Sequence, residues 1–344
     1  MCKRPFKDRD YIRTVENFIF CIVGYEHPPD RVFAYLKYVP ASDGLWCDSR
    51  SCYERKISFY SARDVCATFE FLKQNYPEYI YYCPYNRITF SAVPHSRIEN
   101  WYLPERELSR IIGLKSRDPL QEKLVRLVKL LSKESGIDES RFGVTGSILL
   151  GIHNPRISDI DLVIYGRKES LLLKEVILEL EKKRTIRKFY EERWCIEKSK
   201  FFGIPLEVAR EILRRKWNLG IFEGTRFSVH PVKKDSEITE KYGKKSIIPM
   251  GPIEIEASIS DTSESMFNPA VYGISEVTVI RGPVVEPIRE LVSFEGVFAG
   301  ILEVNERIRV YGKLERVMPE RGVPYYRVVI GSRELSGREH FAIL

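Results

Sequence analysis

Long apolar runs are missing from this sequence. No stretch approaches the roughly 20 consecutive apolar residues that a transmembrane helix requires. The basic segment 1–8 leads into no apolar core of the kind that a signal peptide carries. We therefore expect a cytoplasmic protein with no membrane partner.

Closely spaced cysteine pairs of the CxxC type are also missing. The seven cysteines are odd in number and scattered. Zinc sites usually show tight paired ligands, and secreted disulfide frameworks show even counts. Cys47 and Cys52 are the only close pair, and no second pair of Cys or His follows at the spacing of a zinc finger. The pattern favours free, reduced thiols over a structural zinc.

Neither fixed-period repeats nor low-complexity linkers interrupt the chain. Its 344 residues suggest two or three domains, since a domain typically has roughly 100–200 residues. Hydrophobic residues make up 44% of the chain and charged residues 30%, as is usual for a folded soluble protein. The net charge of +7 favours polyanionic partners such as nucleic acid or nucleoside triphosphates. The oligomeric state stays unknown at this stage.

Three segments differ in their residue patterns, and together they predict an α+β fold. Residues 1–112 mix short aromatic strands with one or two helices, which predicts an α+β N-terminal domain. Residues 113–235 alternate helices and strands, and begin with leucines at helical spacing. In residues 236–344 the helical signal disappears, and short β-rich runs between Gly and Pro turns predict a β-rich, barrel-like C-terminal domain.

A glycine–serine turn forms the first half of the most informative pattern, which spans residues 143–165. A short strand ends at Thr145, and Gly146 and Ser147 then open an apolar helix. Free backbone N–H groups and the helix dipole favour an anion at such a start, and glycine lets a phosphate approach closely. The turn therefore predicts a phosphate-binding site.

Two aspartates form the second half of the pattern. Residues two apart on a strand face the same side, so Asp159 and Asp161 project together while Ile160 and Leu162 point into the core. Adjacent carboxylates repel one another unless a cation lies between them. Oxygen ligands in small number suit Mg²⁺ (or Mn²⁺), which takes its remaining ligands from water and substrate phosphates. A surface acidic turn that binds no metal is the alternative interpretation.

The turn and the aspartates together are the parts that metal-assisted nucleotidyl transfer requires. Their combination resembles the DNA polymerase β superfamily of nucleotidyltransferases. The resemblance implies a small mixed sheet with helices on one side. It also implies that Gly146 and Ser147 bind the triphosphate and that Asp159 and Asp161 bind the catalytic metal. We add Ser158, which directly precedes the aspartates, to the expected nucleotide-binding residues.

The superfamily usually has a third catalytic acid on a later strand. Residues 203–209 fit this description locally, with Glu207 between apolar neighbours. However, Pro205 also suits the first position of a helix, in which Glu207 would be only a favourable first-turn acid. The later strand would then be residues 225–232, which carry no carboxylate. Glu207 is our first candidate for the third catalytic residue, and Glu223 is the second.

A basic run offers a further candidate surface. Residues 181–190 interleave cations with aromatics, and Arg210, Arg214, Arg215 and Lys216 follow. These side chains could track a phosphate backbone or bind a triphosphate. A solvated helix face is the alternative interpretation.

Histidines and aromatic residues are weaker candidates. His153 lies in the loop before the aspartates, where a lone histidine is usually polar surface. His27, followed by two prolines, is more typical of a turn residue than of a base. The aromatic side chains of the first 110 residues could stack bases, but packing in a small core explains them as well.

These features favour an enzyme that binds a nucleoside triphosphate with Mg²⁺ and transfers its nucleotidyl group to a hydroxyl, releasing pyrophosphate. The barrel-like tail and the positive charge favour RNA as the acceptor. The competing interpretation is a non-catalytic RNA- or protein-binding module that keeps the fold. The whole chain also resembles an archaeal family of predicted nucleotidyltransferases, and the resemblance includes residues 24–32 and 34–36.

Overall fold

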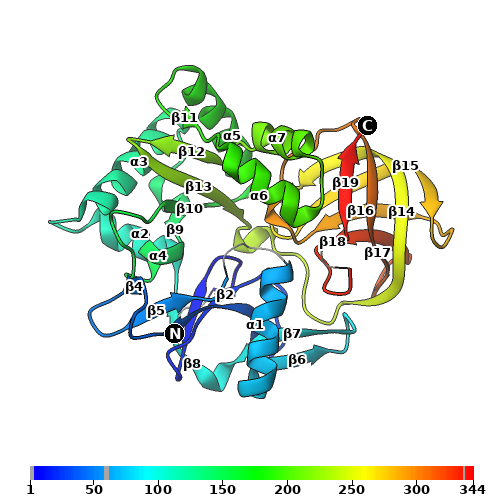
Figure 1. Cartoon of the computed structure of the whole chain (residues 1–344), viewed down its shortest axis with the longest axis horizontal. Coiled ribbons are helices and arrows are strands. Elements are labelled where there is room, and N and C mark those ends of the chain that lie inside the picture. Colours follow the sequence, from blue (N-terminus) through cyan, green and yellow to red (C-terminus); the bar gives the residue numbers. More distant parts are fainter. Residues whose placement is uncertain (1–3, 58–61, 336–337) are drawn as a thin grey trace.

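The computed structural model describes residues 4–57, 62–335 and 338–344, which form three sheets with helices between them (Figure 1). The first sheet, blue and cyan, lies below the other two in this view, and the last, yellow to red, forms a barrel on the right. In the described part of the chain, no helix is long and apolar enough to cross a membrane.

The first sheet has eight strands, and all of its pairings are antiparallel. Its central path runs β4-β5-β3-β2-β1-β8, with β7 paired to β3 and β6 paired to β7. The strands are β1 (Tyr11–Thr14), β2 (Ile19–Ile22), β3 (Arg31–Pro40), β4 (Trp46–Cys47), β5 (Cys52–Arg55), β6 (Ile80–Cys83), β7 (Ile88–Pro94) and β8 (Ile98–Tyr102). The helical elements are α1 (Ala62–Asn75), η1 (Pro77–Tyr79), η2 (His95–Arg97) and α2 (Pro104–Ile112).

Both faces of this first sheet are covered, which explains why β2 is apolar at every position. Phe20 and Ile22 pack on one face in a core that includes Leu72 of α1. Ile19 and Cys21 pack on the other face, in a cluster that includes Leu149, Leu150 and Ile152 of the central part. A strand buried on both faces has no polar side to show in its sequence. Core packing therefore accounts for most of the aromatic content of this region.

The second sheet is small and mixed, with the order β11-β12-β13-β10-β9. Its central strand β10 is antiparallel to β9 and parallel to β13. The strands are β9 (Phe142–Val144), β10 (Ile160–Tyr165), β11 (Arg187–Lys188), β12 (Leu219–Phe222) and β13 (Thr225–Val232). The helices are α3 (Pro119–Ser135), η3 (Glu139–Arg141), α4 (Gly146–Leu149), α5 (Arg167–Lys182), α6 (Glu192–Phe202) and α7 (Leu206–Arg215).

Alternation along β10 divides its side chains between two environments. Ile160, Leu162 and Ile164 are fully buried in a core that they share with α3 and α5. Val163 and Tyr165 face the other way and pack with Tyr25 of the N-terminal part and Val232. The helices α3 and α5 thus cover one face of the sheet, and the other face is turned towards the N-terminal part.

The third sheet has six strands, five of which form a closed circuit. The order is β14-β15-β16-β18-β17-β19, and β14 also pairs with β17. The elements are η4 (Asp235–Glu237), β14 (Lys245–Glu264), β15 (Ala270–Arg281), β16 (Ile288–Ser293), η5 (Gly296–Phe298), β17 (Arg307–Pro319), β18 (Tyr325–Ile330) and β19 (His340–Ile343). The barrel interior shares its core with α6 and α7, through residues such as Phe202 and Leu213.

One cysteine prediction was wrong. Cys47 and Cys52 form a disulfide with an S–S distance of 2.08 Å. They lie directly opposite each other in the β4–β5 hairpin, so the pairing of the two strands brings them together. The other described cysteines are free thiols: Cys21, Cys66, Cys83 and Cys195, whereas Cys2 lies outside the described residues.

Candidate active site

The glycine–serine turn lies directly against the aspartates. The backbone N–H of Thr145 donates to the carbonyl of Asp161 at 2.8 Å, which joins the end of β9 to the start of β10. Gly146 has a φ of 68°, and a Cβ at this position would lie 2.4 Å from Oδ2 of Asp161. Position 146 therefore requires glycine, both for its backbone conformation and for its space. The helix α4 that follows is only one turn long, so a phosphate there would depend on individual N–H groups rather than on a long helix dipole.

The two aspartates differ in exposure and in ionisation. Asp159 precedes β10 and is exposed, whereas the side chain of Asp161 is 22% exposed. The negative charge of Asp161 raises the pKa of Asp159 to about 6, and partial desolvation of the carboxyl group by the atoms around it adds to this shift. Burial opposes ionisation of Asp161, but its polar contact with His230 and the charge of Lys37 hold its pKa below the usual range. Asp161 is thus a fixed carboxylate.

The neighbouring strand β13 places Ser228 opposite Asp161. The Ser228 hydroxyl donates to Oδ1 of Asp161 at 2.5 Å, and its oxygen lies 2.9 Å from Nε2 of His230. A hydroxyl carries one proton, so the chain of bonds is complete when His230 donates from Nε2 to Ser228. Burial lowers the pKa of His230 to about 4, and the charge of Arg9 acts in the same direction, so the imidazole is neutral at pH 7.

The predicted third acid does not lie on this sheet. The strand interpretation of residues 203–209 was wrong, because the segment leads into helix α7 after Pro205. Glu207 lies in the first turn of α7, 78% exposed and 3.7 Å from Nη1 of Arg210. Glu223 lies in the turn between β12 and β13 and pairs with Arg126 at 2.5 Å. The strand beside β10 carries Ser228 where an acid was expected.

Cations from the N-terminal part approach the aspartates, and the sequence analysis missed them. The charges of Lys37 and Arg55 lower the pKa of Asp159, and Lys37 acts on Asp161 as well. Lys37 lies on β3 and is only 2% exposed; its Nζ donates to the hydroxyl of Tyr11 at 2.5 Å. The backbone of Arg9 is anchored to the turn, because its carbonyl accepts a hydrogen bond from Oγ1 of Thr145 at 2.9 Å. The available signal was a lysine within the run of apolar and aromatic residues 32–39 of β3.

The loop before the aspartates is held at both ends. Ser158 accepts a hydrogen bond from the backbone N–H of Asn154 at 3.0 Å and one from Ser147 at 3.4 Å. His153 places Nε2 at 2.8 Å from Oδ2 of Asp118, which caps α3. The predicted nucleotide-binding residues Ser147 and Ser158 are therefore neighbours, and His153 has a structural contact instead of facing a substrate.

The residues at this place fit a divalent cation. The carboxylates of Asp159 and Asp161 interact strongly enough to separate their pKa values, and a cation between them would relieve that repulsion. In residues 4–57, 62–335 and 338–344, no group of three or more His, Cys, Asp or Glu side chains is gathered as for a metal. Two carboxylates suffice for Mg²⁺, which commonly completes its coordination with water and substrate phosphates.

The basic run and the cations after it are mostly engaged within the protein. Arg210 pairs with Glu192, and Arg215 lies 2.6 Å from Glu306. Lys216 is buried and donates to two backbone carbonyls of the barrel part. These contacts favour the structural interpretation of this surface over a phosphate-binding one.

Comparisons with known proteins agree with the geometry. The profile of a family described as a nucleotidyltransferase domain matches residues 124–241. Over 340 residues, 97% of its length, the chain is 29% identical to an uncharacterized protein of Methanocaldococcus jannaschii, and the match covers 98% of that protein. No solved structure matches the chain. The resemblance inferred from the motif is confirmed: residues 124–241 match a nucleotidyltransferase domain family, within a chain that is similar over nearly its whole length to an archaeal protein.

Proposed function

We propose that the protein transfers a nucleotidyl group from a nucleoside triphosphate to a hydroxyl acceptor, in a reaction that depends on Mg²⁺ or Mn²⁺. The single observation that supports this most is the close contact between Asp161 and the Gly146 turn, with Asp159 beside it. This contact puts two metal-binding carboxylates next to the turn that is expected to bind phosphate.

In this proposal each group of residues has a separate role. Asp159 and Asp161 hold the metal, which supplies Lewis-acid polarisation of the phosphate oxygens. Gly146, Ser147 and Ser158 bind the triphosphate through N–H and hydroxyl groups. In the reaction the acceptor oxygen bonds to the α-phosphorus, the bond from that phosphorus to the β-phosphate oxygen breaks, and pyrophosphate leaves. The proton of the acceptor hydroxyl is released to solvent.

Other side chains prepare this site without touching the reacting atoms. Ser228 holds one oxygen of Asp161 and thereby fixes the orientation of the carboxylate. The buried charge of Lys37, together with Arg9 and Arg55, raises the local positive potential that a triphosphate requires. We propose RNA as the acceptor, because the chain carries a net positive charge and a β-barrel.

The test is label transfer from each of the four α-labelled nucleoside triphosphates to total RNA, with Mg²⁺ or Mn²⁺. The combined variant Asp159→Asn and Asp161→Asn is expected to lose at least about a hundredfold in rate, since both metal ligands are changed. The matched control, Asp30→Asn with Asp43→Asn, removes two exposed carboxylates and should keep full activity. Label transfer that survives the first double variant would rule out the assigned site.

The strand β13 also supports the competing function, a binding module without catalysis. It carries Ser228 and His230 but no carboxylate. In that case RNA or a protein would bind equally well to the wild type and to the aspartate double variant, and no label would be transferred under any condition.

A further inference from the structure

The strands of the C-terminal part close into a barrel with a defined order. If β14 to β18 are counted as strands one to five, their order around the ring is 1-2-3-5-4, and the pairing of β14 with β17 closes it. Strands three and five, β16 and β18, are parallel. This is the arrangement of the OB-fold, in which strands two and three and the loop between strands four and five bind oligonucleotides or oligosaccharides. Because one fold serves many ligands, the side chains have to identify the ligand here.

A groove of about 650 Å³ lies beside β16, which is strand three, and the loop between strands four and five, whereas β15 contributes no lining residue. It is formed by the segment before β14, by β16, and by the loop between β17 and β18. Its basic lining side chains are Lys241, Lys244, Lys245, Arg289 and Arg321. Its acidic lining residues are Glu240 and Glu320, and two further carboxylates contact its lining side chains: Glu290 accepts from the hydroxyl of Tyr325 at 3.1 Å, and Glu26 lies 3.0 Å from Lys245. Basic side chains still outnumber acidic ones in this groove, which favours a polyanion over a neutral sugar.

The excess cations in the groove are exposed. Lys244 is neutralised by Glu320 at 2.8 Å, and Lys245 lies 3.1 Å from Glu240. Lys241 and Arg321, by contrast, have no carboxylate within 4.0 Å in the described part of the chain. Both are exposed, as Arg289 is. Three cations are thus available for phosphate groups.

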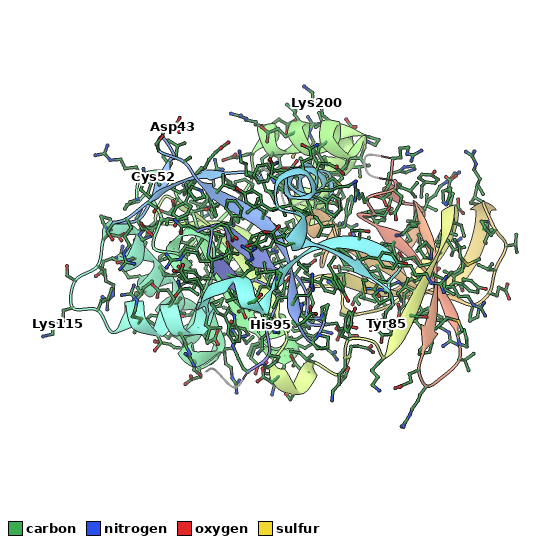
Figure 2. All side chains as sticks on the ribbon, turned by 90° about the horizontal axis from the view of Figure 1, so that it is seen from below. Asp43, Cys52, Tyr85, His95, Lys115 and Lys200 are labelled. Carbon is green, nitrogen blue, oxygen red and sulfur yellow. A yellow bond between two sulfur atoms is a disulfide. The ribbon has the colours of Figure 1, made fainter. Side chains whose placement is uncertain are left out.

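Aromatic rings accompany these cations. The guanidinium of Arg289 lies 5.7 Å from the ring centre of Tyr325, which lines the groove. Next to the groove, the carbonyl of Tyr85 accepts a hydrogen bond from the backbone N–H of Ile247 at 2.7 Å. Figure 2 shows Tyr85, from the β6–β7 hairpin, at the side of the barrel. The residue is 39% exposed, and its ring makes an edge contact with the ring of Tyr242, whose centre lies 5.1 Å from that of Tyr85. Cations that follow a backbone, interleaved with aromatic rings for bases, are typical of surfaces that bind single-stranded nucleic acid.

The groove is within reach of the aspartates along the chain. Lys241 follows Ser228, the residue of β13 that pairs with Asp161, by thirteen positions. Thirteen residues span at most about 47 Å even when fully extended. A single strand of about 14 nucleotides covers that distance even at the 3.4 Å rise of a duplex strand.

We propose that this groove binds the backbone of a single-stranded RNA, at the phosphates, through Lys241, Arg289 and Arg321. Tyr325 and Tyr85 contact its bases. The role of this RNA as the acceptor rests on the proposed nucleotidyl transfer. The binding of RNA to the groove does not depend on that activity.

The test is binding of a fluorescent 20-nucleotide RNA to the full-length protein, followed by anisotropy at about 50 mM and about 200 mM salt. The triple variant Lys241→Gln, Arg289→Gln and Arg321→Gln is expected to bind at least about tenfold more weakly. The slope of its log affinity against log salt concentration should become less negative by about two, since each of the three phosphate contacts contributes roughly 0.7 to the slope on a single strand. The control triple, Lys129→Gln, Lys133→Gln and Lys168→Gln, changes the net charge equally on exposed helix positions and should bind as the wild type does.

The outcomes separate this proposal from that of catalysis. If RNA binding depends on the groove residues but neither the wild type nor any variant transfers label, the RNA-binding proposal stands and the proposed nucleotidyl transfer is wrong. In an active enzyme, the groove triple should raise the KM for RNA and leave kcat unchanged. Three results would contradict RNA binding at the groove. The groove triple could bind RNA as well as the wild type does, both triple variants could lose the same affinity, or the protein could prefer duplex RNA. A DNA strand of the same sequence that binds better than RNA would overturn the choice of RNA.

Discussion

The carboxylate of Asp161 occupies the space that a side chain at position 146 would need. Gly146→Ala would place a Cβ 2.4 Å from Oδ2 of Asp161 and would also strain a backbone with a φ of 68°. We expect label transfer to fall by at least about a hundredfold, because the proposed metal ligand Asp161 is displaced. The free energy of unfolding should fall by about 1–2 kcal/mol or more.

Gly151 is a matched control for this substitution. It has the same φ of 68°, but a Cβ there would meet nothing within 4 Å. Gly151→Ala should therefore lower the free energy of unfolding, measured in urea, by a similar amount through backbone strain. Its rate of label transfer should stay near that of the wild type. Equal activity in the two variants would mean that the Asp161–Gly146 contact does not matter for the reaction.

The aspartates and the turn could be predicted from the sequence because they lie within one short segment. The spacing predicts that Asp159 and Asp161 lie on one side of a strand with Gly146 near them; in the structure Asp161 lies on β10 against Gly146, and Asp159 directly precedes this strand. Ser228 and Lys37 could not be placed in the same way, because they reach the site only through strand pairing and through packing between sheets. Their residue types carry no spacing signal relative to the aspartates.

Helix α3 begins with a cap that also holds the loop before the aspartates. Asp118 accepts hydrogen bonds from the backbone N–H groups of Leu120 at 2.8 Å and Gln121 at 3.0 Å, and its other oxygen contacts His153. Asp118→Ala should therefore lower the free energy of unfolding by about 1–2 kcal/mol in urea titration.

Asn is an equally good cap, so Asp118→Asn should keep most of this stability. The capping and His153 contacts hold the pKa of Asp118 below its usual value even though burial opposes them. The difference in unfolding free energy between the wild type and the Ala variant should therefore be largest above the pKa of an Asp in the unfolded chain. It should shrink as the pH falls below that pKa. An Ala variant as stable as the wild type at neutral pH would contradict the cap.

Elements with strong local periodicity could be predicted, and those set by distant pairing could not. The leucines of α3 and the alternation of β10 gave these elements their correct type. Residues 203–209 fitted a strand or a helix equally well in isolation, and packing of α7 against the barrel core decides for the helix. The parallel pairing of β16 with β18 depends on residues more than 30 positions apart, so the sequence indicated a barrel but not its strand order.

The N-terminal sheet packs against the part of the chain that carries the candidate site, because its face with Ile19 and Cys21 contacts the segment after the glycine–serine turn. Lys37 reaches the aspartates from this sheet. Lys37→Met should raise the KM for the nucleoside triphosphate by about tenfold, because a positive charge near the phosphates is lost. Its free energy of unfolding should also fall, by about 1–3 kcal/mol, since the Tyr11 hydroxyl loses its buried donor and the carboxylate of Asp161 loses a nearby cation.

Steady-state kinetics and urea unfolding of the same preparation check this prediction together. Lys56 lies near the end of β5 and pairs with Glu54 at 2.8 Å, so Lys56→Met serves as the control on the same sheet. A KM for the nucleoside triphosphate that is unchanged in Lys37→Met would mean that this residue of the N-terminal part does not contribute to nucleotide binding.

The barrel is joined to the nucleotidyltransferase domain by a buried lysine whose charge should make stability depend on pH. Lys216, at the end of α7, donates from Nζ to the carbonyls of Gly296 at 2.7 Å and Ala299 at 3.0 Å. Burial lowers its pKa to about 7, and the charge of Lys198 adds to this shift. In the unfolded chain the same group titrates near 10.4. Between these values the unfolded state binds the extra proton, so the folded state gains stability as the pH rises.

Lys216→Met should remove this gain. The difference in unfolding free energy between wild type and variant should grow in favour of the wild type by about 1.4 kcal/mol for each pH unit from about 7 to about 9.5. Urea unfolding at several pH values measures it. Lys244→Met, which changes an exposed lysine paired with Glu320, should show no such slope. A constant difference across the range would mean that Lys216 stays charged in the folded protein, and that the two carbonyls hold a full ammonium group at the junction with the barrel.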